Sequence, residues 1–246
     1  ISKETTYVSY VFLSFCACFL NKKYTSKMKS LIIFDLDGTL LNTITDLGDA
    51  ANHTMAAMGY PQHSPMSYPS MVGNGVAKLI ERALPDSARS PEIIEKALEI
   101  FRAYYDEHLA DSTVPYPGIP ELLDELTSRG VRVAVASNKY ESAVRRIVKH
   151  FFPSIEWAAV CGNVEGVPVK PDPSIVFRVL TESPTPKSEV LYVGDSGVDM
   201  ETARRACVDS VGVTWGFRTA AELRAHYAMY IVNSPSEIAD IALAGE

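Results

Sequence analysis

The chain has 246 residues, of which 47% are apolar and 22% are charged, enough to bury the core of one α/β domain with a modest insertion. Its net charge of −7 argues against a nucleic-acid-binding surface, because such surfaces need clustered lysine and arginine side chains. We therefore expect no nucleic-acid partner, while a locally positive pocket for a small anion remains compatible with this charge.

The first segment, residues 1–27, contains the apolar run Val8–Leu20, which is shorter than the roughly 20 residues that a membrane-spanning helix needs. The residues before this run lack the basic cluster of a signal peptide, and Met28 stands immediately before the first predicted strand. We predict that residues 1–27 are an extension upstream of the fold, with a targeting or anchoring segment as the alternative. We expect no membrane span and a cytoplasmic location.

The four cysteines bear on the expected redox environment. Cys16 and Cys18 form a lone C-x-C pair without a flanking histidine, which argues against a zinc site. Cys161 and Cys207 lie far apart in apolar runs and are predicted to be buried free thiols. A reducing compartment is the expectation that follows.

From Lys29 onward, short apolar runs alternate with helical patterns. The predicted strands are Leu31–Phe34, Val131–Ala136, Trp157–Val160, Val190–Val193, Ser210–Val213 and Tyr230–Val232. The predicted helices are Ile119–Arg129, Glu141–Phe151, Ser174–Thr181, Gly197–Cys207, Ala220–His226 and Ser236–Leu243. This alternation predicts an α/β fold, a Rossmann-like parallel sheet with helices on both faces and ligands beyond the carboxyl ends of its strands.

One stretch interrupts the alternation. Residues from about Thr43 to Pro115 show no strand pattern but contain three predicted helices, namely Ile44–Met58, Val76–Leu84 and Glu92–Leu109. We predict a helical cap domain at residues 43–115, inserted after the first strand and placed over the active edge of the sheet. The core domain would then comprise residues 28–42 and 116–246.

The first candidate chemical cluster, Asp35-Leu36-Asp37-Gly38-Thr39, follows the first strand. In an extended chain Asp35 and Asp37 point to the same side, where two carboxylates repel each other unless a cation or a proton lies between them. A hard cation with oxygen ligands, such as Mg²⁺, is the natural partner. The alternative is a strand-terminal turn with capping aspartates.

Three further clusters occur at or just after predicted strand ends. Ser137 and Asn138, expected at a helix start, could hold phosphate oxygens, although both are also ordinary helix caps. Lys170, in a stiff VPVKPDP loop, could neutralise a phosphate and a carboxylate, although it could also be a surface lysine. Asp195 and Asp199, in GDSGVD, could complete an acidic oxygen site or simply begin a helix.

Together, FDLDGT at 34–39, the Ser137 position, Lys170 and GDSGVD at 194–199 resemble the four motifs of the haloacid dehalogenase superfamily. The resemblance runs from about Leu31 to the C-terminus, and the helical insert resembles the type 1 cap of that superfamily. One departure lies at Ala206-Cys207, where the group commonly has Ala-Gly, and we expect it to affect packing rather than chemistry.

The resemblance implies a magnesium-dependent phosphatase with a small phosphorylated metabolite as substrate. Asp35 would be the nucleophile, and Asp37 would protonate the leaving group and then activate water. Asp35, the Asp37 backbone carbonyl and Asp195 would hold Mg²⁺, while Asp199 would support the metal's water shell or Lys170. Lys170, with Ser137 and Asn138, would hold the phosphoryl oxygens. The acid at Asp37 favours a phosphatase over the dehalogenase branch, which needs none.

Further segments resemble the phosphoglycolate phosphatase group. They are VGNG at 72–75, LIERAL at 79–84, PYPGIPELL at 115–123, ASNK at 136–139 and VTWGFR at 213–218. On this resemblance the substrate is 2-phosphoglycolate or a similar small ester, contacted by Gly73, Asn74 and Gly75 of the cap. The plain alternative for these three residues is a turn between helices. Arg218 is interpreted as a surface residue that flanks a helix, with the rim of the site as the alternative.

Other functions remain open at this point. A phosphosugar mutase, a pyrophosphatase or a nucleotidase would share the core, and a catalytically silent binding module would share the fold. The complete set Asp35, Asp37, Lys170 and Asp195 argues against the silent module. GDSGV lacks the second glycine of G-x-S-x-G, which argues against a serine hydrolase. We expect a monomer or a homodimer.

Overall fold

The computed structural model describes residues 28–244. The predicted extension at residues 1–27, with Cys16 and Cys18, lies outside the described residues. The central sheet has six strands in the order β5-β4-β1-β6-β7-β8, and every neighbouring pair is parallel. The strands are β1 (Leu31–Phe34), β4 (Arg132–Tyr140), β5 (Ala159–Asn163), β6 (Val190–Gly194), β7 (Asp209–Val213) and β8 (Tyr230–Val232). The predicted parallel α/β sheet is thereby confirmed.

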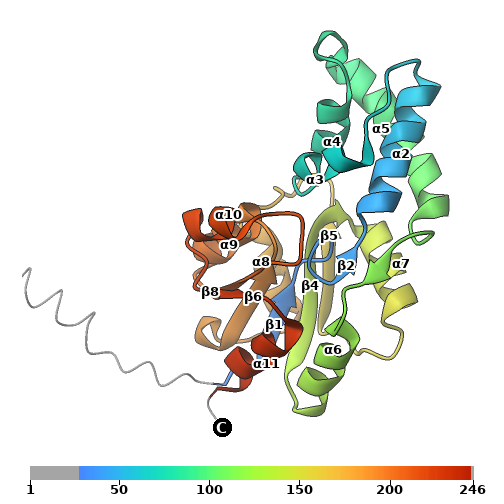
Figure 1. The fold of residues 1–246 in the computed structure, drawn as a ribbon. Helices are drawn as coiled ribbons and strands as arrows, with labels where there is room; N and C mark the ends of the chain where they lie inside the picture. The colour runs from blue at the N-terminus through green and yellow to red at the C-terminus, as the bar shows by residue number, and fades with distance from the viewer. Residues whose placement is uncertain (1–27, 245–246) are drawn as a thin grey trace, which may run out of the picture.

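Helices cover both faces of this sheet (Figure 1). Helices α6 (Ile119–Ser128), α7 (Glu141–Phe151) and α11 (Pro235–Leu243) pack on one face. Helices α8 (Ser174–Glu182) and α9 (Gly197–Ala206) pack on the other, with α10 (Ala220–Ala225) beside β7 and β8. Strand β1 is entirely buried because alternate residues, such as Ile32 and Ile33, enter the two different cores. A continuous apolar run is what a strand buried on both faces requires.

A group of helices stands beyond one end of the sheet (Figure 1). It contains α2 (Ile44–Ala57), α3 (Tyr68–Met71), α4 (Val76–Ala83) and α5 (Pro91–His108), with short 3₁₀ turns at Pro65–Ser67 and Asp86–Ala88. The chain enters this group after β2 (Leu41–Asn42) and leaves it before β3 (Val114–Pro115), and these two strands pair antiparallel. We call α2–α5 the helical roof. That it forms a separate domain stays a prediction.

The structure corrects three details of the predicted elements. The stretch predicted to lack strands contains β3, whose two residues are too few to produce an alternating pattern. Strand β5 spans Ala159–Asn163, two or three residues later than the predicted Trp157–Val160. Ser137 and Asn138 lie inside β4, whose irregular register with β5 after Ala136 carries the strand on to Tyr140, and α7 begins only at Glu141.

The two described cysteines differ in their environment. Cys161 is a buried free thiol, as predicted, whereas Cys207 is exposed, which corrects the prediction for that residue. Cys207 caps the end of α9 with a φ of 58°, the left-handed conformation that glycine adopts without strain. The departure from the usual Gly at this position therefore affects the backbone conformation at the end of α9. Among residues 28–244, no helix is long and apolar enough to cross a membrane.

Candidate active site

Three buried carboxylates converge at the carboxyl ends of β1 and β6. Asp35 follows β1 directly, Asp195 follows β6, and Asp199 lies in the first turn of α9. One carboxylate oxygen of each lies within 4.8 Å of one oxygen of the other two. The chain leaves β1 for β4 on one side and returns to β6 on the other, so this is the point at which the strand order reverses. Ligands of open parallel sheets bind at this position.

Lys170 supplies positive charge to the three carboxylates. Its Nζ lies 2.9 Å from Oδ1 of Asp35 and 2.7 Å from Oδ1 of Asp199, and it donates to the backbone oxygen of Ala136 at 3.1 Å. The side chain is almost fully buried. One lysine against three carboxylates leaves two negative charges unbalanced if all are ionised. The donor set is therefore one of hard oxygen atoms with excess negative charge, which fits a divalent cation such as Mg²⁺.

The proton affinities of the cluster reflect this imbalance. Burial, reinforced by the charge of Asp199, raises the pKa of Asp35 to about 7. Burial, again reinforced by Asp199, also raises the pKa of Asp195 above its ordinary value. Burial alone would lower the pKa of Lys170, but the carboxylates of Asp199 and Asp35 raise it, so the ammonium stays charged. Ionisation of Asp35 and Asp195 therefore costs free energy, and a bound cation would offset this cost.

Glycines allow the backbone to approach Asp195. Gly38 has a φ of 84°, and a Cβ on it would lie 2.4 Å from Oδ2 of Asp195. A Cβ on Gly216 would lie 2.4 Å from the same oxygen, which accepts a hydrogen bond of 2.6 Å from the Phe217 N–H. Two loops from different parts of the chain therefore fix the Asp195 carboxylate, and neither tolerates a side chain at the contact.

Both oxygens of Asp199 are engaged within the protein. Oδ1 accepts from Lys170, and Oδ2 accepts from the Ser196 hydroxyl at 2.5 Å in a capping box at the start of α9. Tyr192 also donates to Oδ1 at 3.3 Å. This arrangement orients Lys170 and stabilises the first turn of α9.

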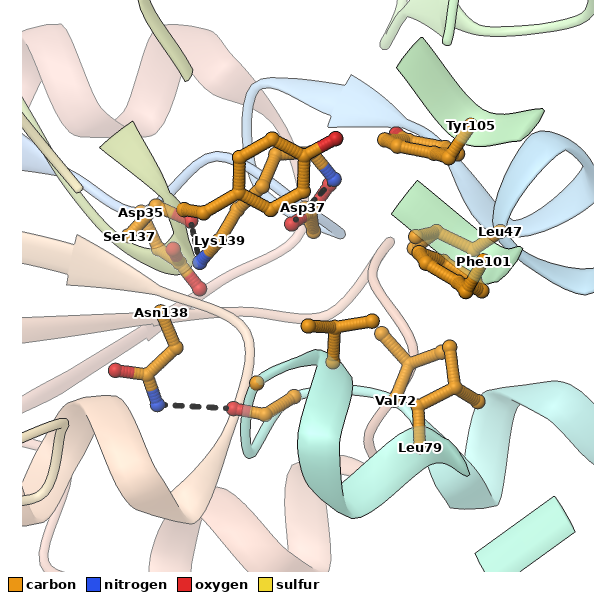
Figure 2. A pocket seen from close by; sticks show the side chains of 14 residues that line it. Asp35, Asp37, Leu47, Val72, Leu79, Phe101, Tyr105, Ser137, Asn138 and Lys139 are labelled. Atoms are coloured by element: carbon orange, nitrogen blue, oxygen red, sulfur yellow. Dashed lines mark hydrogen bonds and ion pairs between the residues drawn. The ribbon is translucent and has the colours of Figure 1, made fainter. Parts of the chain in front are cut away.

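Ser137 and Asn138 also reach the site. The Ser137 hydroxyl accepts from the Lys139 N–H at 3.2 Å and lines the pocket. The Asn138 side chain accepts from the Lys170 N–H at 2.8 Å and donates to the Gly73 carbonyl at 3.3 Å, a bond drawn in Figure 2. Asn138 thus fastens the Lys170 loop to the roof, and its amide is used for positioning.

A pocket opens between this cluster and the helical roof (Figure 2). The core side of the pocket is polar, with Asp35, Asp37, Ser137, Asn138, Lys139 and Tyr140. The roof side comprises Leu47, Val72, Gly73, Gly75, Val76, Leu79, Phe101 and Tyr105. Gly73 and Gly75 therefore line the pocket, and their contact with a substrate stays a prediction. Asn74 does not line the pocket, because its side-chain oxygen accepts from Arg82 at 2.9 Å.

Three residues near Asp37 were not predicted from the sequence to be part of the site, namely Thr43, Lys139 and Tyr105. Lys139 lies 2.9 Å from Oδ1 of Asp37, which also accepts from the Thr43 hydroxyl at 2.7 Å. Tyr105 on α5 lies beside this pair, with its ring centroid 4.8 Å from the Lys139 Nζ. The position of Lys139 directly after Ser137-Asn138 was a usable signal. Nothing in the local sequence distinguished Tyr105 from a core aromatic residue.

Arg218 connects the core to the roof. Its guanidinium donates to the backbone oxygens of Pro69 and Val72, the latter at 2.6 Å, in the segment that leads into Gly73. The side chain is only 16% exposed, which corrects its interpretation as a surface residue that flanks a helix. The roof is therefore held over the site by side chains of the core, Arg218 and Asn138.

Comparisons with known proteins identify the family of the chain. A family model described as haloacid dehalogenase-like hydrolase matches residues 32–213. A phosphoglycolate phosphatase from Pseudomonas savastanoi pv. phaseolicola is 35% identical over 199 residues, covering 79% of this chain and 72% of that protein. One from Aquifex aeolicus is 31% identical over 208 residues, 85% of this chain and 94% of that protein. A crystal structure from Lactobacillus delbrueckii subsp. bulgaricus superposes with a TM-score of 0.83 at 30% identity, covering 89% of this chain and 100% of that one.

Proposed function

Because the chain belongs to the haloacid dehalogenase-like hydrolases and is a phosphatase, we propose that it hydrolyses small phosphomonoesters through an aspartyl-phosphate on Asp35, with Mg²⁺ as cofactor. The observation that carries this proposal is the convergence of Asp35, Asp195 and Lys170 at one strand edge. An anionic nucleophile can approach an anionic phosphoryl group only where positive charge offsets their repulsion. Lys170 supplies one such charge, and the acidic oxygen cluster fits the cation that supplies the rest.

The proposed reaction has two steps. In the first, an Asp35 oxygen forms a bond to phosphorus while the bond from phosphorus to the ester oxygen breaks, and Asp37 gives its proton to the departing alkoxide. In the second, Asp37 takes a proton from water, which attacks phosphorus and releases Asp35 and inorganic phosphate. Both aspartates line the pocket, and Thr43 and Lys139 hold the Asp37 carboxylate in place.

Mg²⁺ would be held by the carboxylates of Asp35 and Asp195 and the backbone carbonyl of Asp37, with Asp199 supporting its water shell and Lys170. Bound there, the ion would supply positive charge against the phosphoryl oxygens. Ser137 and Lys170 would bind those oxygens directly. Asn138 would act with them by fixing the Lys170 loop, as its hydrogen bond to the Lys170 N–H indicates.

We propose 2-phosphoglycolate as the substrate, because several curated relatives between 31% and 35% identical are phosphoglycolate phosphatases. Residues 43–115, which contain the helical roof, would act as a cap domain over a core of residues 28–42 and 116–246. The hydrogen bonds from Arg218 and Asn138 would keep the roof closed over the site and exclude water from it. A phosphosugar mutase, a pyrophosphatase or a nucleotidase would use the same core chemistry with a different ligand beneath the roof.

The test is kcat/KM for a panel of small phosphomonoesters, pyrophosphate, a nucleoside monophosphate and para-nitrophenyl phosphate, each with and without Mg²⁺. We expect Mg²⁺-dependent hydrolysis with 2-phosphoglycolate preferred. Asp35→Asn, which keeps the shape of the side chain, is expected to lower kcat by at least about a thousandfold. Equal turnover by this variant would remove the covalent mechanism. A clear preference for another substrate would replace 2-phosphoglycolate but leave the reaction in place.

A further inference from the structure

The roof side of the pocket carries one polar side-chain group. Leu47, Val72, Val76, Leu79 and Phe101 present only carbon atoms to the pocket, and Tyr105 adds a hydroxyl. Tyr105 is completely buried, and within residues 28–244 its hydroxyl has no hydrogen-bond partner. Burial raises the pKa of Tyr105 to about 12, so the hydroxyl stays protonated and can donate. A buried polar group without a partner is costly, and such groups are rare away from binding sites.

Lys139 lies beside Tyr105 in the pocket, and its ammonium interacts electrostatically with the tyrosine hydroxyl. Figure 2 shows the two side chains converging on the Asp37 side of the pocket, Lys139 from β4 and Tyr105 from α5. The Lys139 Nζ lies 2.9 and 3.2 Å from the two Asp37 oxygens and 4.8 Å from the centroid of the Tyr105 ring. An ammonium group has three N–H donors, so after these two contacts one donor remains for another acceptor.

The two groups together define the acceptor that fits them. It must accept from a cationic donor and a neutral donor that lie side by side, which favours an anion with two oxygens. It must also belong to the molecule whose phosphoryl group faces Asp35. Because Asp35 and Asp37 are only two residues apart, the anion must lie within a few bonds of the ester oxygen.

We propose that Lys139 and Tyr105 form a carboxylate subsite, which selects phosphate esters of short hydroxy acids in which the carboxylate is attached to the carbon that bears the phosphate. This inference rests on the proposed phosphatase function and names the feature of the substrate that the roof recognises. A phosphorylated sugar fits less well, because its hydroxyl groups would face Leu47, Val72 and Phe101 without hydrogen-bond partners. An ester without a carboxylate would leave the donors of Lys139 and Tyr105 unpaired.

The test compares 2-phosphoglycolate with ethyl phosphate, in which a methyl group replaces the carboxylate. The measured quantity is the ratio of the two kcat/KM values, which we expect to exceed about a hundredfold in the unmodified protein. Tyr105→Phe removes only the hydroxyl and should lower this ratio by about tenfold, because one hydrogen bond to a charged group is lost. Lys139→Met should lower the ratio further, because it removes the charge.

Tyr104→Phe is the matched control. It makes the same chemical change one residue earlier on α5, but the Tyr104 ring stacks on His53 and His108, with centroids 4.1 and 4.2 Å apart, and does not line the pocket. Its ratio should equal that of the unmodified protein. Thermal unfolding of each variant checks that the fold is retained. If Lys139→Met does not fold, the comparison of Tyr105→Phe with Tyr104→Phe decides alone.

The outcomes separate the subsite from the underlying function. If the protein hydrolyses both esters but Tyr105→Phe keeps the ratio within twofold, the carboxylate subsite is refuted and the phosphatase function stands. If Tyr104→Phe lowers the ratio as much as Tyr105→Phe, the hydroxyl of Tyr105 has no specific role and the subsite is again refuted. If the unmodified protein hydrolyses neither ester nor para-nitrophenyl phosphate in Mg²⁺, the proposed function itself fails.

Discussion

The two sides of the pocket differ in the kind of side chain that lines them, charged and polar on the core side and mostly apolar on the roof side. The core side buries charged groups, and each of them is paired with an opposite charge, as Lys139 is with Asp37 and Asp35 is with Lys170. The roof side buries carbon atoms and one hydroxyl, that of Tyr105, which has no hydrogen-bond partner among residues 28–244. The core therefore provides a fixed electrostatic environment for phosphoryl chemistry. The roof provides an apolar surface with one hydrogen-bond donor.

This difference indicates how reaction and selection are divided. Changes on the core side should affect every substrate alike, because the phosphoryl group is common to all of them. Changes on the roof side should affect substrates unequally, because they touch only the part that differs. The predictions below test that division, beginning with the largest effect.

Removal of Lys170 should produce the largest effect. Lys170→Met leaves Asp35 and Asp199 buried without their common partner, and breaking a buried ion pair in this way costs about 3–5 kcal/mol of stability. Turnover of every phosphomonoester should fall by at least about a hundredfold, because one charge that stabilises the transferring phosphoryl group is lost. Urea unfolding and kcat on two esters measure the two effects.

Lys187→Met is the control for this change. Lys187 is exposed and lies over the Phe177 ring at 4.9 Å. It precedes the amino end of β6, whereas the three carboxylates lie beyond the carboxyl end of that strand. Its loss should change neither stability nor kcat appreciably. If Lys170→Met lowered the turnover of one ester and spared another, the division between core and roof would be wrong.

The next effect concerns the cation. Asp195→Asn keeps the acceptor for the Phe217 N–H but removes one charge from the cluster. Since burial raises the pKa of Asp195, the ionised group opposes folding, and the variant should melt at a higher temperature than the unmodified protein in EDTA. Added Mg²⁺ should reverse the order of the two melting temperatures, because the unmodified protein binds the ion more tightly. At a Mg²⁺ concentration of 100 times Kd, binding adds about 2.7 kcal/mol to the free energy of unfolding.

The same cluster predicts the pH dependence of the metal-free protein. Asp35 holds its proton more tightly when folded, because burial raises its pKa from an ordinary value of 3.8 to about 7. The folded state then binds more protons between these values, so stability should fall as the pH rises from about 4 to 7.

Asp124→Asn, an exposed site on α6, is the control and should leave both the metal response and the pH response unchanged. A Mg²⁺ response that survives in Asp195→Asn would contradict the proposed ligand set.

How far the sequence predicted this site depended on distance along the chain. The positions of Asp35 and Asp195 followed from strand ends, because parallel strands bring their carboxyl ends to one edge whatever lies between them. Lys170 lies in the loop between β5 and α8, and no strand end fixed its place. The link from Arg218 to Pro69 and Val72 spans nearly 150 residues and has no local pattern. The sequence therefore could not show it.

The partners of side chains on the roof were also not evident from the sequence. The Asn74 side chain accepts from Arg82 and does not line the pocket, and its contact with a substrate stays a prediction. Tyr105 sits in the spacing of a core residue, with Phe101 four positions before it, and only the folded chain shows that its hydroxyl has no partner. The spacing of residues on a helix predicts which face is buried but not what that face meets.

The smallest effect should come from the contact between the two regions. Arg218→Ala removes two hydrogen bonds that hold the Pro69–Val72 segment over the site, and we expect KM to rise about fivefold to tenfold with a smaller change in kcat. Steady-state kinetics with 2-phosphoglycolate measure the effect. Arg224→Ala, on the exposed side of α10, is the control. A change in kcat alone would place Arg218 in the chemistry and not in the closure of the roof.

The most direct measurement is chemical trapping of the phosphorylated enzyme. The protein is mixed with substrate and Mg²⁺, quenched in acid within one turnover, reduced with borohydride and digested for mass spectrometry. Reduction converts an aspartyl-phosphate into homoserine, and we predict this change at residue 35 and at no other aspartate. Homoserine at residue 37, or none at any position while phosphate is released at the normal rate, would contradict the role given to Asp35.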